Sequence, residues 1–534
     1  VGGVYDATSQ ENIVNNDFQI QFTKKFSDFS NKLITGFNVY QRRTKFTEIS
    51  SGSVIVPDIY NISNRVGDLA GSENNTQFRK FGYYADLNTS YKNYLYLNLS
   101  GRYDASSKFY KVGRSSDLYS YISYGGSLSF VATDAFPTLQ SNILSFAKLR
   151  IGYNVNGNDN IDPHKLDIVY PNAPGFPYGG LFGGTVGDVL PDPNLGREKV
   201  FSYEIGGEFA LFGNRLNLDV TAYRQDSKDM ILTVKLPNTT GYPYLQANVA
   251  DAQNWGYEAD AKVQILRGGK LTWDFGVRYS YNDNKVNNLY GNVNQFVYGG
   301  YSYASTYMIK DQRYPFLKAS GYSRDPSTNM IIVDSASGYP MQAPGLLDFG
   351  GTLPRHILGL GSKLAYKNFE FSFNFEYRGG NMVFHQLGRD MTFTGSGKWT
   401  EDRTPHVFPN SVYYDRSKSQ YVVNTDRNVR ESEYALWVDY YRFVSENFIT
   451  PGWFIKLRDI NLSYTFSNQL LSKTKVFTGA NIALYGRNLF TIVDEKNYYT
   501  DPEFSYTTGN GIGINNTNQT PPVRQYGINL NLIF

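Results

Sequence analysis

Residues 369–378 of the chain read FEFSFNFEYR, with an aromatic side chain at every second position. Alternate side chains of an extended strand point to opposite faces, so this segment has one aromatic face and one polar, partly charged face. Residues 214–226 and 94–103 alternate in the same way. Such segments run for roughly 10 to 15 residues, whereas strands of globular proteins are mostly about 5 to 6 residues long and a tilted membrane-spanning strand needs about 9 to 11. Their length favours strands that cross a membrane over those of a soluble sandwich.

The composition agrees with a β protein that has long polar loops. The 534 residues include 50 Gly, 45 Tyr and 36 Phe, and only 19% are charged. This is too aromatic for a disordered chain and does not match the Ala-, Leu-, Glu- and Lys-rich composition of helical proteins. The net charge is only +3, without a basic face that would indicate nucleic-acid binding. No apolar run approaches the ~18 residues of a membrane-spanning helix, and the absence of cysteine excludes disulfides and thiol chemistry.

Fifteen segments are predicted to form strands. They lie at Asp17–Phe26, Lys32–Arg43, Phe78–Tyr91, Tyr94–Asp104, Leu118–Thr133, Leu144–Asn156, Lys199–Phe212, Arg215–Ser227, Asn248–Leu266, Lys270–Lys285, Arg355–Tyr366, Phe369–Val383, Trp453–Phe466, Lys475–Phe490 and Arg524–Phe534. Short turns are expected at Ser27–Asn31, Lys92–Asn93, Phe212–Asn214, Arg267–Gly269 and Lys367–Asn368. Long loops are expected at Thr44–Gln77, Val155–Glu198, Val286–Pro354, Phe384–Gly452 and Thr491–Val523.

Short turns and long loops alternate along the chain, and this alternation indicates whether the strands belong to a membrane barrel or to a soluble one. Outer-membrane barrels have short periplasmic turns and long extracellular loops, and a soluble barrel has no reason to collect its long loops at one end. Two connections depart from the pattern, since Asp134–Ile143 is long for a turn and Ala105–Asp117 is short for a loop. We therefore predict an all-β fold, a transmembrane antiparallel β-barrel with long extracellular loops, rather than a soluble β protein.

The two ends of the chain bear on the number of strands. The last predicted strand is amphipathic and ends in Phe534, as in the signal read by the bacterial outer-membrane assembly machinery, with an ordinary closing strand as the alternative. If Phe534 is periplasmic, an odd count of fifteen places residues 1–16 in an extracellular loop. Complete bacterial barrels have an even number of strands. Either the count is wrong, or the chain, which opens at Val1 without an initiator Met, is the C-terminal part of a larger barrel.

Several short motifs in a fixed order resemble one family. They are PNLGRE at 193–198 followed by YEIG at 203–206, NWGYE at 254–258, FIKLRDINLSY at 454–464, YGRNLFT at 485–491 and DPE at 501–503. Together they resemble the SusC/RagA family of TonB-dependent outer-membrane transporters, from about Tyr83 to the end of the chain. The sequence departs from the family pattern at Gly196 and Arg197, where Lys-Trp is commoner.

This resemblance implies an architecture and a set of partners. Large outer-membrane transporters have about 22 strands and a plugged lumen, so residues 1–534 are expected to form the C-terminal portion of the barrel, with an N-terminal plug and about seven strands absent from this chain. The resemblance also implies a SusD-like surface lipoprotein as a lid, and TonB acting through the absent plug. The expected location is the outer membrane of a Gram-negative bacterium, with outer-membrane lipid and possible further outer-membrane subunits as neighbours.

No residue pattern in the chain indicates catalysis. The four histidines, His164, His356, His385 and His406, lack the spacing of metal ligands. We therefore expect no catalytic residue, no metal and no cofactor. Carboxylates on the polar strand faces, such as Glu370 and Glu376, are expected to pair with Arg378 and neighbouring arginines and to hold the polar wall of the lumen together.

The long loops supply the candidate binding residues. Flat aromatic rings among Asn, Gln, Asp and Arg suit stacking on sugar rings, although tyrosines also pack loops and form the interfacial girdle of barrels. The candidates for contact with substrate or lid are Tyr178, Tyr298, Tyr301, Tyr303, Tyr307, Trp399, Tyr413 and Tyr414. Because Tyr298 is even-numbered while Tyr301, Tyr303 and Tyr307 are odd-numbered, their segment must bend if all four converge.

The leading functional hypothesis is TonB-dependent import of an oligomeric nutrient, an oligosaccharide in preference to an oligopeptide. A SusC-like barrel that serves as a structural subunit of a larger outer-membrane assembly is the main alternative. A siderophore receptor would share the barrel, but the SusC-like motifs argue against it.

Overall fold

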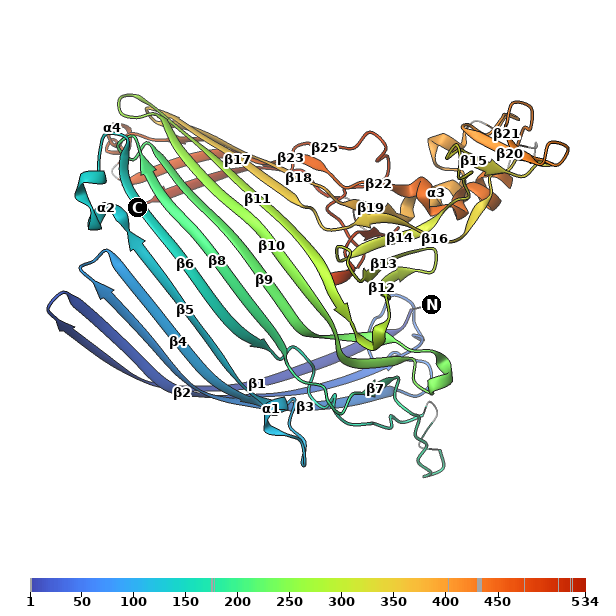
Figure 1. Ribbon diagram of the computed structural model, residues 1–534, viewed down its shortest axis with the longest axis horizontal. Coiled ribbons are helices and arrows are strands. Elements are labelled where there is room, and N and C mark those ends of the chain that lie inside the picture. The colour runs from blue at the N-terminus through green and yellow to red at the C-terminus, as the bar shows by residue number, and fades with distance from the viewer. Residues whose placement is uncertain are drawn as a thin grey trace. The chain divides into compact units, whose positions relative to one another are not determined.

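The computed structural model describes residues 2–173, 176, 178–401, 403–429, 435–474, 476–507, 509–518, 520 and 522–534. Apart from short helices, the ordered elements are β-strands (Figure 1). The chain divides into two compact units. Unit 1 consists of Val1–Ala135, Leu149–Ile205 and Gln225–Asp251, and unit 2 consists of Phe136–Lys148, Gly206–Arg224 and Ala252–Phe534.

Unit 1 contains an antiparallel meander in which each strand pairs with the next one along the chain (Figure 1). Its strands are β1 (Val4–Phe26), β2 (Phe29–Ser51), β3 (Ala70–Tyr91), β4 (Leu95–Ser106) and β5 (Ser120–Val131). The register brings Phe26 opposite Phe29. Lys92 and Asn93, between β3 and β4, both have positive φ, as the central residues of a type I′ hairpin turn require.

Four strands contribute residues to both units. They are β6 (Leu144–Asn158), β8 (Glu198–Leu211), β9 (Leu216–Lys235) and β10 (Tyr244–Leu266). Within unit 1, the three-residue strand β7 (Val189–Pro191) pairs in parallel with the start of β10. A small apolar core of Phe109, Ile161 and Leu195 lies in this unit.

The long strands of unit 2 continue the antiparallel pattern. β11 pairs with β17, β17 with β18, β18 with β23, β23 with β24, and β24 with β27. Their bounds are Leu271–Leu289 for β11, His356–Tyr366 for β17, Phe369–Gly379 for β18, Phe454–Thr465 for β23, Gly479–Arg487 for β24 and Gln525–Ile533 for β27. A short strand, β25 (Thr491–Val493), pairs with the start of β23.

The long loops of unit 2 fold into small sheets of their own. One sheet contains β12 (Gln295–Tyr301), β13 (Ala304–Ile309), β14 (Phe316–Tyr322) and β16 (Gln342–Gly351). A second contains β15 (Ile331–Val333), β20 (Ser411–Asp415) and β21 (Gln420–Val423), and a third contains β22 (Ile449–Pro451), β19 (Met382–His385) and β26 (Ile514–Asn515). Two apolar clusters support these sheets, one around Phe384, Phe448 and Ile514 and the other around Tyr322 and Phe408.

Besides several 3-10 turns, the described ranges contain four short α-helices. They are α1 (Ser116–Tyr119) and α2 (Ala132–Ala135) in unit 1, and α3 (Gln386–Thr394) and α4 (Asn468–Leu471) in unit 2. A π-helical turn at Leu436–Tyr440 follows in the loop region of unit 2. Within the described ranges, no helix combines the length and apolar character needed to cross a membrane.

The structure confirms the all-β fold and the strand pattern. Each of the fifteen predicted segments overlaps a strand, and the five predicted short turns join strands that pair with each other or follow directly in the chain. One predicted segment contains two strands instead of one. Phe369–Val383 is divided into β18 and β19 because Gly380 adopts a positive φ of 89°, which interrupts the extended backbone.

Two expectations about loops are wrong. Residues 4–16 do not form a loop but extend β1, which pairs with β2 up to the Val4–Ser51 pair. The strand continues past the amphipathic segment because a ladder of backbone hydrogen bonds does not require an apolar face. The second correction concerns the segments expected as long loops, all of which contain strand residues. Residues 286–354 contain β12 to β16, residues 384–452 contain β20 to β22, residues 491–523 contain β25 and β26, residues 155–198 contain β7, and the ends of residues 44–77 belong to β2 and β3. β12 to β15 have seven residues or fewer, too short to be recognised from alternation over 10 or so residues, and the ten residues of β16 do not alternate between apolar and polar.

Candidate functional site

Residues 369–378 have the two faces that their sequence predicts. The rings of Phe371, Phe373 and Phe375 follow one another on one face, with centroids 5.9 and 5.5 Å apart. On the other face, the amide of Asn374 donates to the carboxylate of Asp459 at 2.9 Å. β18 therefore separates an aromatic surface from a polar one.

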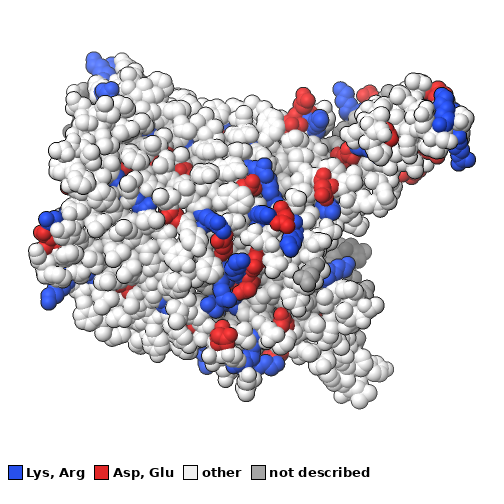
Figure 2. Space-filling model, in the orientation of Figure 1, with Lys and Arg blue, Asp and Glu red and all other residues white. Residues whose placement is uncertain are grey.

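The apolar faces of other strands carry tyrosines beside exposed aliphatic residues. In unit 1, Tyr153 contacts Tyr124 on β5 and Tyr203 on β8, with ring centroids 6.3 and 5.0 Å apart. Ile122 and Ile205, each two residues from one of these tyrosines, are exposed. Exposed apolar residues rimmed by aromatic rings are typical of the lipid-facing band of outer-membrane barrels. Figure 2 shows the matching charge pattern, with wide uncharged areas and residues of opposite sign side by side.

The polar face of β18 and β23 carries a network of paired charges. Lys456 Nζ lies 2.6 Å from Asp501 Oδ2 and 2.6 Å from Glu503 Oε2. Arg458 binds the same Glu503 carboxylate at 2.7 Å and reaches Glu376 at 2.9 Å. The network ties the segment after β25 to the barrel wall.

The carboxylates expected to pair on the polar face do so. Glu376 pairs with both Arg378 and Arg458. Glu370 pairs at 2.7 Å with Lys363 on the neighbouring strand β17, a lysine rather than an arginine. These pairs account for the charged residues of β18 as contacts within the polar wall.

Glu503 lies in the segment after β25, outside the membrane-spanning strands. Burial would by itself raise the pKa of its carboxyl, but hydrogen bonds from Arg458 and Lys456 outweigh burial and lower the pKa to about 2. Glu503 is therefore ionised at any pH near neutrality. Residues 454–464 and 501–503, two of the motifs that carry the family resemblance, meet in this contact.

A cavity of about 380 Å³ adjoins Lys456. Its lining combines aromatic rings with amide, hydroxyl and basic groups. The lining residues are Lys456, Asn488, Phe490, Thr491, Val493, Asn497, Tyr498, Tyr499, Thr500, Asp501, Pro522 and Arg524. Tyr499 connects this cavity to the apolar cluster, since its ring contacts Phe448 and its hydroxyl donates to the Asn447 carbonyl.

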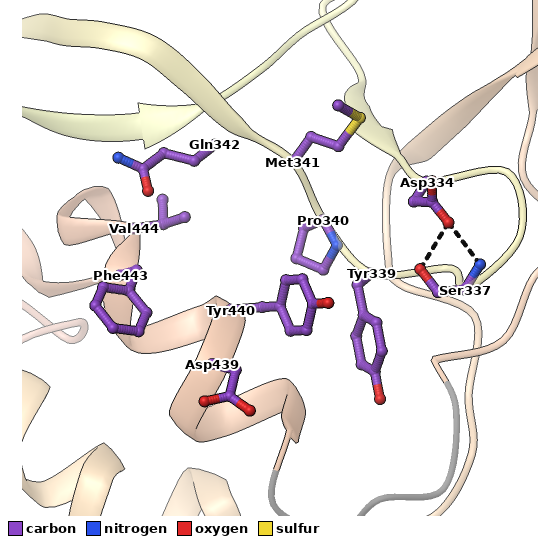
Figure 3. Close-up of a pocket in the computed structure, with 10 residues that line it drawn as sticks. All are labelled: Asp334, Ser337, Tyr339, Pro340, Met341, Gln342, Asp439, Tyr440, Phe443 and Val444. Carbon is purple, nitrogen blue, oxygen red and sulfur yellow. Dashed lines mark hydrogen bonds between the residues drawn. The ribbon is translucent and has the colours of Figure 1, made fainter.

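A larger cavity of about 540 Å³ lies in the loop region of unit 2 (Figure 3). The segment that leads into β16 forms one side, and the turn at Leu436–Tyr440 with the residues after it forms the other. The lining residues are Asp334, Ser337, Tyr339, Pro340, Met341, Gln342, Asp439, Tyr440, Phe443 and Val444. The rings of Tyr339 and Tyr440 stack with centroids 4.1 Å apart and planes 8° apart.

The four tyrosines predicted between β11 and β17 do not share one contact. Tyr301 and Tyr303 stack, with centroids 5.2 Å apart, and pack against the apolar cluster around Phe384. Tyr298 contacts Tyr314 instead. A β-bulge between Val297 and Gly299 shifts the register of β12 at Tyr298, which accounts for the change of parity.

Three further predicted residues each pack against a different part of the loop region. Tyr307 is buried beneath the Lys318 ammonium, which lies 5.5 Å from its ring. Trp399 packs edge-on against Tyr499, whose ring also lines the smaller cavity. Tyr413 packs against the cluster around Tyr322.

Tyr414 and Tyr178 are the remaining two. Tyr414 makes an edge-on contact with Tyr421, and its side chain is exposed. Tyr178 is exposed in a tight turn with Leu181. None of the eight predicted residues is among those that line the two cavities.

Sequence reasoning missed the aromatic pair of the larger cavity. Tyr339 and Tyr440 come from two different long loops, and the spacing within one loop carries no information about a partner in the other. The only signal was their residue type, since both loops are rich in aromatic and acidic residues.

Among the side chains that the structure describes, no three His, Asp or Glu are grouped so as to hold a metal ion. His385 is fully buried, with Nε2 2.8 Å from the Thr450 hydroxyl and its ring against Tyr499. Burial lowers the pKa of its imidazole to about 3, so the ring is neutral. It acts as a packing and hydrogen-bonding residue of the loop region.

Long antiparallel strands with short turns, an apolar face rimmed by tyrosine and a polar face of paired charges define a β-barrel protein of the outer membrane. The family described as TonB dependent receptor-like, beta-barrel, matches residues 2–489, and the chain belongs to this family. The family is one of transporters, in agreement with the absence of enzymatic chemistry expected from the sequence.

Individual relatives confirm the resemblance to the SusC/RagA type. The TonB-dependent receptor SusC of Bacteroides thetaiotaomicron is 24% identical over 446 residues, which are 79% of this chain and 41% of SusC. The TonB-dependent receptor P26 of Formosa agariphila is 25% identical over 501 residues, 86% of this chain and 46% of P26. The structure of the RagAB peptide transporter has the same fold, with a TM-score of 0.76 at 18% identity over 99% of this chain and 56% of that chain. The chain spans less than half the length of these two curated relatives.

Proposed function

We propose that this chain is the C-terminal barrel portion of a TonB-dependent importer of an oligomeric nutrient, with a SusD-like surface lipoprotein as its lid. The observation that carries the proposal is the folded loop region of unit 2, which holds an aromatic-lined cavity of about 540 Å³. Cavities of roughly 300–1,000 Å³ with a few polar groups are typical of sites for organic ligands. The site thus suits part of an oligomer better than an ion.

In this proposal an oligosaccharide is the preferred cargo and an oligopeptide the second choice. Tyrosines beside Asp, Gln and Ser side chains supply both a flat surface and hydrogen-bonding partners for hydroxyl groups. TonB acts through a plug that precedes these strands in the complete protein, together with about seven further strands. The residues of β1 from Tyr5 to Phe26 are all exposed. A neighbouring strand on the second edge of β1 would cover part of their surface, so this exposure supports the proposal of additional strands.

Among the predicted contact residues, we propose that Tyr178, Tyr298 and Tyr414 meet the lid or the substrate, since their side chains are exposed. Tyr307 is buried in the loop region and serves its packing. Tyr301, Tyr303, Trp399 and Tyr413 are partly covered, so that each retains some surface for a ligand.

The test is uptake by cells that carry a chromosomal deletion complemented with the full-length gene. Growth on defined oligosaccharides and oligopeptides as sole carbon source is measured with the intact protein and with a variant that lacks its TonB-binding segment. We expect growth on at least one oligomer to require the intact protein, and a lipoprotein to co-purify with it. Growth that is indifferent to both deletion and variant would instead support a structural subunit.

A further inference from the structure

One wall of the larger cavity is a tyrosine ring that stacks on a second, buried tyrosine ring. Tyr339 is buried, with 7% of its surface exposed, while Tyr440, stacked on it at 4.1 Å, is 37% exposed. The buried ring fixes the orientation of the outer ring, and the outer ring keeps surface available at the cavity (Figure 3). An aromatic ring that is already oriented loses little conformational freedom when a flat ligand stacks on it.

Polar groups surround this ring. The exposed carboxylate of Asp439 lies next to Tyr440 in the sequence, and Gln342 lies on the opposite side of the cavity (Figure 3). Asp334 is held by the backbone N–H of Ser337 at 2.7 Å and its hydroxyl at 2.8 Å, which fixes the turn at the edge of the cavity. Asp439 and Gln342 thus offer oxygen acceptors and amide donors to a ligand.

The charge of the cavity limits the class of ligand. None of its ten lining residues is Lys or Arg. Two arginines contact Phe443 but also pack on other rings: the Arg442 guanidinium lies 4.5 Å from the Phe443 ring and 4.4 Å from the Phe393 ring, and the Arg389 guanidinium lies 3.7 Å from the Tyr303 ring. An anionic ligand would meet the carboxylates of Asp439 and Asp334, and an apolar ligand would remove those carboxylates from water without compensation.

We propose that this cavity is a subsite for a neutral saccharide ring, which stacks on Tyr440 and donates hydroxyl hydrogens to Asp439. The proposal names a substrate class and a position within the proposed function, on which it rests. One face of a pyranose ring presents C–H groups, and these pack against the electron-rich face of an aromatic ring. The hydroxyls at the rim of the sugar suit a carboxylate and an amide, which together accept and donate.

The test uses the full-length protein in detergent micelles on a glycan array of neutral oligosaccharides, with uronic-acid oligosaccharides and basic peptides on the same array. We expect at least one neutral oligosaccharide to bind. Tyr440→Ala should weaken its binding about tenfold or more, equivalent to about 1.4 kcal/mol, while Tyr440→Phe, which keeps the ring, should bind within about twofold of the wild type. Tyr290→Ala is the matched control, since Tyr290 is an exposed tyrosine of the long loops of unit 2 outside the cavity, and should have no effect.

Three results would overturn the subsite: binding of no neutral oligosaccharide, equal binding by Tyr440→Ala and the wild type, or preference for the acidic or basic probes. Uptake in cells separates this failure from failure of the importer. If Tyr440→Ala binds and imports as the wild type does, the subsite is wrong and import stands. If the wild type imports no oligomer, the proposed function itself fails.

Discussion

The ammonium group of Lys456 lies 2.6 Å from the carboxylate of Asp501, and both side chains are almost fully buried, with 4% and 5% exposed. Lys456 belongs to β23, and Asp501 to the segment between β25 and β26. A buried ion pair adds little stability compared with apolar residues of the same shape, but removal of one partner leaves an uncompensated buried charge. This contact therefore fixes where the segment lies more than it strengthens the fold.

The first prediction concerns this pair. Lys456→Met should lower the free energy of unfolding by about 3–5 kcal/mol, because Asp501 then stays buried without its cation. Adding Asp501→Asn should recover part of the loss, since the unpaired charge is gone while Glu503 keeps Arg458. Urea unfolding of the folded protein in micelles measures both.

The control for this prediction is Lys363→Met. Lys363 pairs with Glu370 where both side chains are well exposed, so the variant should cost no more than about 1 kcal/mol. Equal losses for the two lysine variants would contradict the burial argument.

The second prediction concerns His385 and acid. Burial lowers the pKa of its imidazole to about 3, against an unfolded value of about 6.5. Well above pH 6.5 the ring is neutral in both states, so its contribution to stability is constant there. As the pH falls from about 6.5 toward 3, only the unfolded state takes up the proton, and stability is lost.

His385→Phe keeps a ring beside Tyr499 and removes the titration. The variant loses the hydrogen bond to Thr450, so it should be less stable at pH 7 but should show a smaller decrease in melting temperature between pH 6.5 and 4. His164→Gln, at an exposed position, should keep the wild-type slope. An unchanged slope in His385→Phe would mean that other groups account for the acid sensitivity.

The third prediction tests which face of β18 meets lipid. Arg in place of Phe373, near the middle of the strand, should cost about 2–4 kcal/mol because the charge faces hydrocarbon. Arg in place of Asn374 should cost much less, since Asn374 faces Asp459 on the polar side. Refolding into vesicles and urea titration compare the two, and similar losses at both positions would argue against a polar barrel interior.

The barrel strands could be predicted from the sequence because their determinant is local. In Phe371, Phe373 and Phe375 the alternation itself records which face is buried in lipid, and no distant residue is needed to read it. The short turns follow for the same reason, as at Lys92 and Asn93, where two residues alone must reverse the chain.

The loop region could not be predicted in this way because its contacts join distant segments. The stack of Tyr339 on Tyr440 and the contact of Lys456 with Asp501 each depend on two segments that fold toward each other. Tyrosine is also common in this chain, so residue type alone did not distinguish cavity residues from packing residues such as Tyr307. The extension of β1 was missed because residues 4–16 lack an apolar face, although their backbone pairs fully with β2.

The last prediction separates packing from partner contact among the aromatic loop residues. Tyr307 is buried with 9% of its surface exposed, whereas Tyr298 is 41% exposed. Tyr307→Ala should lower the free energy of unfolding by about 3 kcal/mol or more, because it leaves a cavity in the loop region. Tyr298→Ala should change stability by less than about 1 kcal/mol and instead reduce co-purification of the lid lipoprotein or uptake of the nutrient, since an exposed tyrosine can bury about 150–250 Å² in a contact. Melting curves of the full-length protein, with pull-down and uptake in the same strains, give both readouts. If Tyr298→Ala retains wild-type lid binding and uptake while the barrel folds, this tyrosine belongs with the packing residues and is not a contact site.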